Sequence, residues 1–441
     1  MPSLLIESAK ILVNNELTTA NLFIVDGIIN KITKLKTNIQ TENRIDARGL
    51  LALPGLIDAH VHLRDMDLSY KETFETGTKA AAAGGFTTVI EMPNTRPPTI
   101  SATALVDKIG HARNQIYTNI AFQAALVDDQ MEMQKMKEHG AVAFKLFLNK
   151  SLETFNSSDE TELRRALSAA KSLDGLVTVH AEDGHAIKQI QERSIALGRT
   201  SVNSFLRAHA PRMEVSAVKT ILAISTKLNL RVHICHITTA QAVQLVRKSK
   251  NATCEATAHH LLLDHSTFKK YGTMAICVPP IRSSESRRQL WSQFVKGRVD
   301  ILASDHAPHT LEEKKNRNAW KAATGVPGLE TSLPVMLTQV WNGKLSLNRL
   351  IEAAATLPAK IFGLKGKGRL REGYDADIVL VNPKTKKIIR PRLFLSKAKF
   401  SPFEGMHCRG EVVYTIVNGN VVFEHGKIVG PPTGRVVRSD T

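Results

Sequence analysis

Eight short apolar runs, separated by stretches with helical spacing, constrain the fold of residues 55–364 more than any other feature of the sequence. The runs lie at 56–62, 86–92, 118–124, 142–147, 176–180, 232–236, 253–256 and 299–303. Helical stretches between them include 74–83, 160–172 and 240–248. Strands that alternate with helices predict a parallel sheet, and eight such units are the number found in a (β/α)8 barrel. We therefore expect an α/β chain built on a TIM-like barrel.

The two ends of the chain have a different texture, with short β segments separated by polar turns. The first 50 residues include the turn Asp26-Gly27. The part after about residue 366 includes Asn418-Gly419, which is a strong signal for a type I′ hairpin. We expect residues 1–54 and 365–441 to form one small β-sandwich domain beside a barrel made of residues 55–364.

Composition narrows the class of protein. Hydrophobic residues make up 43% of the chain and charged residues 23%, which is ordinary for a soluble globular protein. The four cysteines are widely spaced and form no Cys-x-x-Cys pair, so neither a disulfide framework nor a thiolate zinc site is expected. No signal-peptide pattern and no apolar run of about 20 residues are present. These patterns indicate a cytoplasmic protein without a membrane partner.

The chain is strongly basic, with 59 Lys and Arg residues against 41 Asp and Glu residues and a formal net charge of +18. Such a charge indicates either a nucleic-acid partner or a surface that attracts small anions. The most one-sided stretch, 384–399, contains no acidic residue and a single aromatic residue, Phe394. Because nucleic-acid sites usually interleave aromatic and basic residues, we interpret this stretch as a solvated face and expect no nucleic-acid partner.

Six residues that can take part in a metal site lie in or directly after five of the predicted strands. They are His60, His62, Lys145, His180, His236 and Asp305. Taken singly, each has a simpler interpretation: a packed histidine, a lysine that snorkels to solvent, or an aspartate that caps the next segment. However, His60 and His62 face one side of their strand, and the carboxyl ends of barrel strands form the active-site face. The convergence of six such residues predicts a metal centre there.

Lys145 needs a separate explanation, because a protonated ammonium group has no lone pair for a cation. A neutral lysine that captures carbon dioxide becomes a carbamate, whose two oxygens can bridge two metal ions. Desolvation favours the neutral amine that this capture requires. A purely structural lysine is the alternative, and it carries the cost of burying a charged group.

These residues, together with several longer segments, resemble the amidohydrolase superfamily and, within it, the class I dihydroorotases. His-x-His and the aspartate define only the superfamily, whereas Arg64 with 92–95 points to dihydroorotase. The segments that carry the resemblance are His60-Val61-His62-Leu63-Arg64, 70–77 with Gly84-Gly85, Glu91-Met92-Pro93-Asn94-Thr95-Arg96-Pro97, Thr253-Cys254-Glu255, Ser304-Asp305-His306-Ala307-Pro308-His309-Thr310, Gly325-Val326-Pro327-Gly328-Leu329-Glu330 and Ser401-Pro402-Phe403-Glu404-Gly405.

The resemblance implies a role for each candidate residue. One zinc ion would be held by His60, His62 and Asp305, a second by His180 and His236, and carboxylated Lys145 would bridge the two. Substrate would be contacted by Arg64 and Asn94, which grip a ring carboxylate, and by His309.

The implied reaction is the reversible hydrolysis of dihydroorotate to N-carbamoyl-L-aspartate, a step of pyrimidine (UMP) biosynthesis. A hydroxide shared by the metals would attack the ring amide, with Asp305 acting first as base and then as acid. A homodimer and an association with aspartate carbamoyltransferase are further expectations from the resemblance.

Two departures from the family pattern bear on the substrate. The family usually shows Arg-Glu-Pro-Gly where this chain has Arg64 followed by Asp65-Met66-Asp67. Val278 stands where relatives commonly place a polar substrate contact. The loss of one hydrogen bond to a charged ligand predicts binding weaker by about 1.5–3 kcal/mol, unless Arg282 compensates.

Three alternatives stay open. A hydantoinase, dihydropyrimidinase or allantoinase would use the same metal site, but its substrate has no ring carboxylate to pair with Arg64. A catalytically silent scaffold is expected to lose metal ligands, and here all six positions are filled. Nucleic-acid binding would rest on the net charge alone. We therefore favour dihydroorotase.

Overall fold

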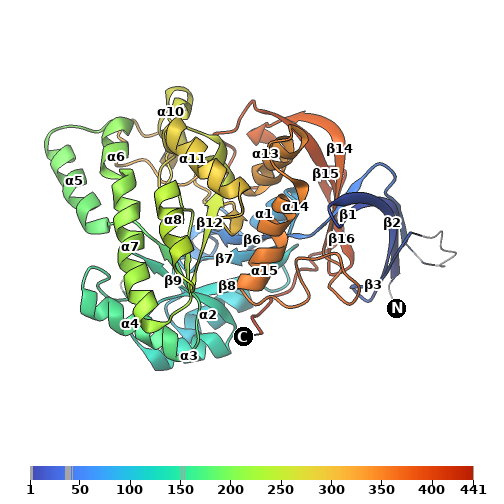
Figure 1. Cartoon of the computed structure of the whole chain (residues 1–441), viewed down its shortest axis with the longest axis horizontal. Helices are drawn as coiled ribbons and strands as arrows, with labels where there is room; N and C mark the ends of the chain where they lie inside the picture. The colour runs from blue at the N-terminus through green and yellow to red at the C-terminus, as the bar shows by residue number, and fades with distance from the viewer. Residues whose placement is uncertain (1–2, 35–40, 42, 150–151, 153, 441) are drawn as a thin grey trace.

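The computed structural model describes residues 3–34, 41, 43–149, 152 and 154–440, and it contains two separate sheets. Figure 1 shows the barrel strands inside a layer of helices, with a second sheet from both chain ends beside them. The predicted fold class, an α/β barrel with a β domain built from the termini, is confirmed.

Each of the eight predicted apolar runs corresponds to a strand of the barrel. The strands are β6 (Leu56–Val61), β7 (Phe86–Glu91), β8 (Asn119–Ala125), β9 (Ala141–Phe147), β10 (Val177–His180), β11 (Val232–Ile234), β12 (Ala252–Thr257) and β13 (Ile301–Ala303). Neighbours pair in parallel in chain order from β6 to β13. A parallel bridge between Val61 and His306, with a 2.8 Å hydrogen bond from His62 N to His306 O, closes the barrel. All carboxyl ends therefore surround one mouth.

The helices around the barrel begin and end where the local sequence favours it. In α1 (Phe74–Ala83), Thr73 caps the amino end and Gly85 leaves the helix with a φ of 82°. Helices α1, α4 (Glu160–Ser172) and α8 (Ala240–Lys248) have the predicted bounds.

The remaining helical elements lie between consecutive strands along the chain. The α-helices are α2 (Ala102–Ala112), α3 (Gln130–Glu138), α5 (Gly184–Ala196), α6 (Val202–Ala208), α7 (Pro211–Leu228), α9 (Ala258–Leu262), α10 (Ser266–Tyr271), α11 (Ser284–Val295), α12 (Leu311–Lys314), α13 (Leu329–Trp341), α14 (Leu347–Ile351) and α15 (Leu357–Ile361). Shorter turns are η1 (Met66–Leu68), η2 (Gly272–Ala275), η3 (Glu352–Thr356) and η4 (Pro391–Leu393). Within the described ranges, no helix combines the length and apolar character that crossing a bilayer requires.

The second sheet contains nine strands from the two ends of the chain. They are β1 (Ser3–Val13), β2 (Glu16–Val25), β3 (Ile28–Thr33), β4 (Asn43–Asp46), β5 (Leu51–Pro54), β14 (Ile378–Ile388), β15 (His407–Val417), β16 (Asn420–Glu424) and β17 (Lys427–Ile428). Strand β5 joins the two ends, because it pairs in parallel with β1 and antiparallel with β14.

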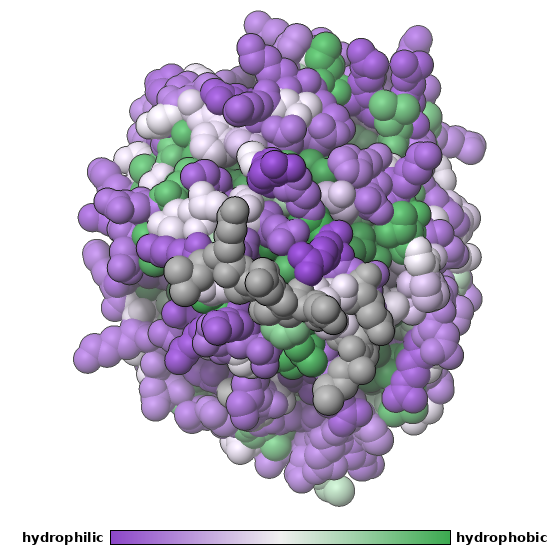
Figure 2. Space-filling model, turned by 90° about the vertical axis from the view of Figure 1, so that its right-hand side faces the viewer, coloured by the Kyte–Doolittle hydropathy of each residue, from purple (hydrophilic) through white to green (hydrophobic). Residues whose placement is uncertain are grey.

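Local sequence explains the turns and the core of this sheet. Asn418 and Gly419 have φ angles of 50° and 80°, as a type I′ turn requires, and they connect β15 to β16. Apolar side chains from both ends, such as Ile6, Leu22 and Ile378, are fully buried against one another. Figure 2 shows this side of the molecule, where hydrophilic residues predominate and apolar residues are scattered.

A buried carboxylate joins the second sheet to the barrel. Asp377 accepts hydrogen bonds from Lys367 Nζ at 2.7 Å and from Asn418 N at 2.8 Å. The side-chain amide of Asn119, on barrel strand β8, donates to it at 3.2 Å. Near the carboxyl end of the chain, Val436 returns to pair with Ile120 of β8. Chain ends and barrel are thus held together by buried polar contacts as well as by apolar packing.

Part of the basic stretch 384–399 has structural partners. Lys387 forms an ion pair with Glu411 of the neighbouring strand β15. Lys397 Nζ donates to the carbonyl of Ser69 at 2.6 Å. Lys387 is thus held against β15, and Lys397 is held against the loop between η1 and α1.

Candidate metal centre

All six predicted metal-site residues lie at the mouth of the barrel and are buried, with 1–7% of each exposed. His60 belongs to β6, Lys145 to β9 and His180 to β10, where the strands place them. His236 and Asp305 lie in the turns directly after β11 and β13. Both turns are left-handed, with φ of 33° at His236 and 46° at Asp305. Such backbone costs about 1–3 kcal/mol per residue and is concentrated at functional sites.

The first group of ligand atoms comes from β6 and the turn after β13. Asp305 Oδ1 lies 3.2 Å from His62 Nε2 and 3.4 Å from His60 Nε2. The three side chains can therefore offer one carboxylate oxygen and two Nε2 atoms to a single ion.

The second group comes from β10 and the turn after β11. His180 Nδ1 lies 2.9 Å from His236 Nε2, and the two rings meet edge to face with centroids 4.6 Å apart. The ring of His236 lies 5.1 Å from that of His60, so the two groups are adjacent.

Partners outside the centre select which nitrogen of three histidines faces inward. His60 Nδ1 lies 2.5 Å from Glu255 Oε1, and His62 Nδ1 lies 2.7 Å from Asn94 Oδ1. His180 Nε2 lies 3.0 Å from Glu182 Oε2. Because each outer nitrogen donates to an oxygen, the inner nitrogen of a neutral ring keeps its lone pair, as metal ligands require.

Glu182 and Glu255 extend these contacts to further histidines. Glu182 also accepts from His209 Nδ1 at 3.0 Å, and Glu255 from His233 Nε2 at 3.1 Å. Both carboxylates are fully buried. The histidines overcome the cost of burial and hold the pKa of each carboxyl well below its usual range. Two charged, hydrogen-bonded carboxylates thus support the centre from outside.

The protonation of the inner groups largely fits cation binding. Burial lowers the pKa of His62 to about 4 and also lowers those of His180 and His236, so these rings are neutral at pH 7. Despite burial, the neighbouring histidines hold the pKa of Asp305 well below its usual range. His60 is the exception: although burial opposes its charge, Glu255 and Asp305 raise its pKa to about 10. A cation replaces that proton when it binds.

Lys145 lies beside this centre, on β9 between β8 and β10. Its Nζ is 3.0 Å from Cys235 Sγ and 4.9 Å from the centre of the Phe147 ring. Within the described part of the chain, Lys145 has no carboxylate within ion-pair distance. The buried amine of Lys145 therefore faces a thiol and an aromatic ring.

Two of the three predicted substrate contacts touch each other at the same mouth. Arg64 follows β6, and its Nη2 lies 3.3 Å from His309 Nε2. Arg64 Nε donates to the carbonyl of Pro308 at 3.3 Å. Arg64 is buried, with 8% of the residue exposed. Among the described residues no acidic side chain forms an ion pair with it. Asn94, the third, contacts the centre through His62 instead.

His309 is kept neutral by its surroundings. Burial, with the charges of Arg64 and Lys71, lowers its pKa to about 2. Its Nε2 lies 3.2 Å from the carbonyl of Thr324, and its Nδ1 lies 3.2 Å from Lys71 Nζ. This arrangement favours an Nε2–H tautomer that donates to Thr324 and accepts from Lys71.

The departure after Arg64 forms a tight turn with its own support. Arg64, Asp65 and Met66 have φ angles of 61°, 43° and 50°, all in the left-handed region. The Asp65 carboxylate accepts from Met66 N at 2.7 Å and from Phe74 N, at the start of α1, at 2.5 Å. The Asp65 carboxylate therefore ties this turn to the first residue of α1.

The second departure has no compensation from Arg282. Val278 packs against an apolar cluster that includes Phe205 and Ile276. The guanidinium of Arg282 donates from Nε to Thr238 Oγ1 at 2.8 Å and from Nη1 to the carbonyl of His209. Arg282 thus braces loops around the barrel instead of replacing the polar group that Val278 lacks.

Sequence reasoning missed the carboxylates that orient the ligands. Glu255 lay within a segment that supported the family resemblance, and Glu182 follows His180 by two residues. The spacing His180-x-Glu182 was an available signal. Nothing in the sequence paired Glu255 with His60, because 195 residues separate them.

Comparison with known proteins finds a matching family model and similar chains over most of the sequence. A family model described as "Amidohydrolase family" matches residues 51–422. The dihydroorotase of Methanothermobacter thermautotrophicus is 37% identical over 428 residues, covering 93% of this chain and 92% of that protein. The allantoinase of Rubrobacter xylanophilus is 33% identical over 428 residues, covering 95% and 94%.

A solved structure gives the same picture at the level of the fold. The L-hydantoinase (dihydropyrimidinase) from Arthrobacter aurescens superposes with a TM-score of 0.95 at 32% identity, covering 99% of this chain and 100% of that one. The names of these similar proteins thus refer to different cyclic amides.

Proposed function

The chain belongs to the amidohydrolase family and is a cyclic amidohydrolase, and on that premise we propose that it is a dihydroorotase. It would hydrolyse (S)-dihydroorotate reversibly to N-carbamoyl-L-aspartate in pyrimidine biosynthesis. The names of several relatives at 35–37% identity support this choice. The observation that carries it is the surroundings of Arg64.

Arg64 is a buried cation without an ion-pair partner among the described residues, beside the centre where the chemistry takes place. Leaving such a charge unpaired is costly, so the position favours an anionic ligand. A guanidinium can meet a carboxylate with two parallel hydrogen bonds. Dihydroorotate has a carboxylate on its ring, whereas unsubstituted hydantoin and allantoin have none. Arg64 therefore selects the acid among these cyclic amides.

The donor set fits two divalent cations, which we propose to be zinc. The proposed ligands are His60, His62 and Asp305 for one ion, and His180 and His236 for the other, with carboxylated Lys145 between them. When bound, such ions polarise a carbonyl and lower the pKa of a bound water. Glu255, Asn94 and Glu182 orient the histidines for this task.

Asp305 is the proposed general base and acid. Its carboxylate lies at the centre of the mouth and is ionised at neutral pH, so it can accept a proton from the attacking water. It then delivers that proton to the ring nitrogen that leaves. In the cyclising direction Asp305 takes the proton from that nitrogen and returns it to the departing water.

The remaining parts of the proposal concern context. The chain would act in the cytoplasm, with residues 55–364 as the catalytic domain and residues 1–54 with 365–441 as the second domain. A homodimer and an association with aspartate carbamoyltransferase stay within the proposal. Neither a nucleic acid nor a membrane is a proposed partner.

A second candidate, ring opening of a hydantoin, is favoured by one observation. Val278 packs in an apolar cluster and gives the pocket no polar group where class I dihydroorotases commonly have one. Without that contact a charged substrate loses a strong hydrogen bond. A neutral hydantoin ring loses less binding free energy.

The two candidates differ in a single assay of the purified protein. Metal per chain is measured first, and then hydrolysis of dihydroorotate, hydantoin and allantoin is compared, with Lys145→Ala as control. We expect about two metal ions per chain and a preference for dihydroorotate. Preference for hydantoin or allantoin would reject the substrate and keep the chemistry. Absence of both metal and turnover would reject the enzyme.

A further inference from the structure

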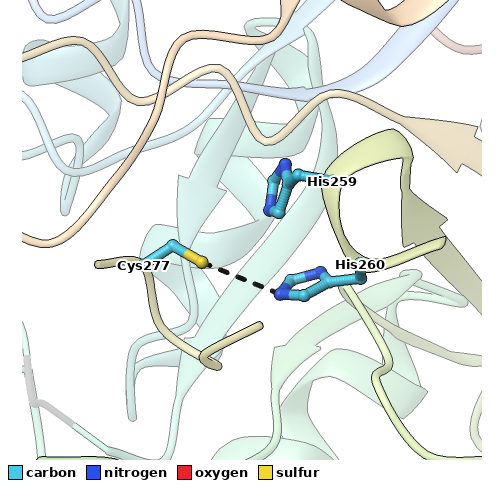
Figure 3. A group of neighbouring side chains, drawn as sticks. All are labelled: His259, His260 and Cys277. Atoms are coloured by element: carbon cyan, nitrogen blue, oxygen red, sulfur yellow. Dashed lines mark hydrogen bonds between the residues drawn. The ribbon is translucent and has the colours of Figure 1, made fainter. Parts of the chain in front are cut away.

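A second group of buried metal-ligating side chains lies near the barrel mouth, outside the centre described above. His259 and His260 belong to α9, and Cys277 lies just after η2 (Figure 3). One potential ligand atom from each residue lies within 4.8 Å of the other two. Figure 3 shows the three side chains turned toward one another, with His260 and Cys277 in contact.

His259 has a nitrogen that the rest of the described protein leaves unused. Its Nε2 is buried and has no hydrogen-bond partner there, and the residue is only 2% exposed. Burial lowers its pKa to about 4, so the ring is neutral. A buried polar atom without a partner costs about 1–3 kcal/mol, and a ligand that engages it recovers this cost.

The other two side chains, His260 and Cys277, donate to the same acceptor. His260 Nε2 donates to the carbonyl of Pro279 at 2.9 Å, and Cys277 Sγ donates to the same oxygen at 3.3 Å. Cys277 Sγ lies 3.8 Å from His260 Nε2. Thr257 Oγ1 lies 2.8 Å from His260 Nδ1 and can donate or accept there. The imidazole and the thiol can therefore both be released for another partner.

We propose that His259, His260 and Cys277 form a third cation site, for a d10 ion such as Zn²⁺ or Cd²⁺. Thiolate sulfur and imidazole nitrogen are the ligands that these ions prefer. The S–H bond of Cys277 breaks as the sulfur–metal bond forms, and its proton passes to solvent. The ring proton of His260 moves from Nε2 to Nδ1. From there the N–H group donates a hydrogen bond to Thr257 Oγ1. One proton is released per ion, and no group is oxidised or reduced.

Occupation of the site is coupled to the substrate pocket. Tetrahedral zinc, with bonds of about 2.0–2.3 Å, holds its ligand atoms about 3.5 Å apart, whereas Cys277 Sγ lies 3.8 Å from His260 Nε2 in the structure. Binding therefore draws segment 276–281 toward α9. This segment carries Val278, so turnover falls as the site fills. The coupling rests on the proposed function, whereas the binding does not.

The test is a titration of the protein carrying its native metal ions with Cd²⁺. Thiolate-to-cadmium absorption in the near ultraviolet, metal content per chain and turnover of the best cyclic amide substrate are recorded together. We expect one additional ion per chain, an absorption band that saturates at one equivalent, and turnover that falls in parallel. Cys277→Ser should lack the band, and His259→Gln should bind the ion at least 10-fold more weakly. Cys408→Ser removes a buried thiol elsewhere and should behave as wild type.

The outcomes separate the site from its coupling and from the proposed substrate. A missing band in wild type, a band that persists in Cys277→Ser, or cadmium that only displaces native ions would overturn the site. A saturated band with unchanged turnover would overturn the coupling. Because the band and the metal content need no substrate, both remain informative if dihydroorotate is not hydrolysed.

Discussion

Glu255 Oε1 lies 2.5 Å from Nδ1 of His60, and this contact spans the barrel interior between β12 and β6. The same carboxylate reaches His233 and the backbone N–H of His236, at 3.1 and 3.2 Å. One buried acid therefore orients a proposed ligand of the first ion and the turn that carries a ligand of the second. Glu255 therefore supports residues of both proposed ion sites.

Glu255→Gln should weaken metal binding without changing the fold. The amide keeps the size of the side chain, but it loses the charge that supports the N–H of His60. Loss of such a partner typically costs about 10- to 100-fold in metal affinity or activity. Metal per chain after dialysis against a chelator measures the effect. Asp300→Asn, at the amino end of β13, is the control, and equal metal retention in both variants would contradict the role of Glu255.

Lys145→Ala should lower turnover by more than about 100-fold. Loss of a residue that only orients a ligand costs up to that much, whereas this substitution removes the proposed bridge itself. Wild-type protein stripped of metal should regain activity faster when bicarbonate accompanies the metal, since the amine must first capture carbon dioxide. Reactivation rates with and without bicarbonate test this. Lys108→Met, which removes another buried lysine, should keep the bicarbonate dependence. A wild-type rate indifferent to bicarbonate would exclude the carbamate.

Glu330 should make stability depend on pH. Burial raises its pKa to about 8, although the N–H groups of Leu395 and Ser396 favour the charged form. The folded protein then binds a proton that the unfolded chain has released, between about pH 4.5 and 8. The free energy that Glu330 contributes to folding is therefore most favourable below that window, and it becomes less favourable as pH rises through it, by at most about 1.4 kcal/mol per unit.

The measurement is urea unfolding of wild type and Glu330→Gln from pH 5 to 8. The variant lacks the titrating group, so its stability relative to wild type should improve as pH rises. A difference between the two proteins that stays constant across this range would show that Glu330 does not titrate there.

The barrel and its proposed ligands could be predicted because their signals are local. Buried parallel strands read as short apolar runs, and a ligand such as His180 stands at the end of its own strand. Even the Asn418-Gly419 turn is encoded by two adjacent residues. Each of these features needs only a few neighbouring positions to be recognised.

Other features depend on contacts that only the closed barrel creates. Arg282 could have faced the substrate pocket, and only the packing of α7 and the loop after β11 shows that it serves Thr238 and His209. Asp65 looked like a departure from the family pattern, and only the folded chain shows that its carboxylate accepts from Phe74 N. Long-range pairing, rather than residue type, decides these roles.

Arg64 is proposed to bind a carboxylate on the substrate ring, and two substrates that differ only in that group test this role directly. Dihydroorotate and 5,6-dihydrouracil share the ring, and kcat/KM for each is measured with wild type and with Arg64→Met. Wild type should strongly prefer dihydroorotate, and the variant should lose about 10- to 150-fold of that preference, as a charged hydrogen bond of about 1.5–3 kcal/mol implies. Equal use of both rings by wild type, or a preference that survives in Arg64→Met, would show that Arg64 does not select the ring carboxylate.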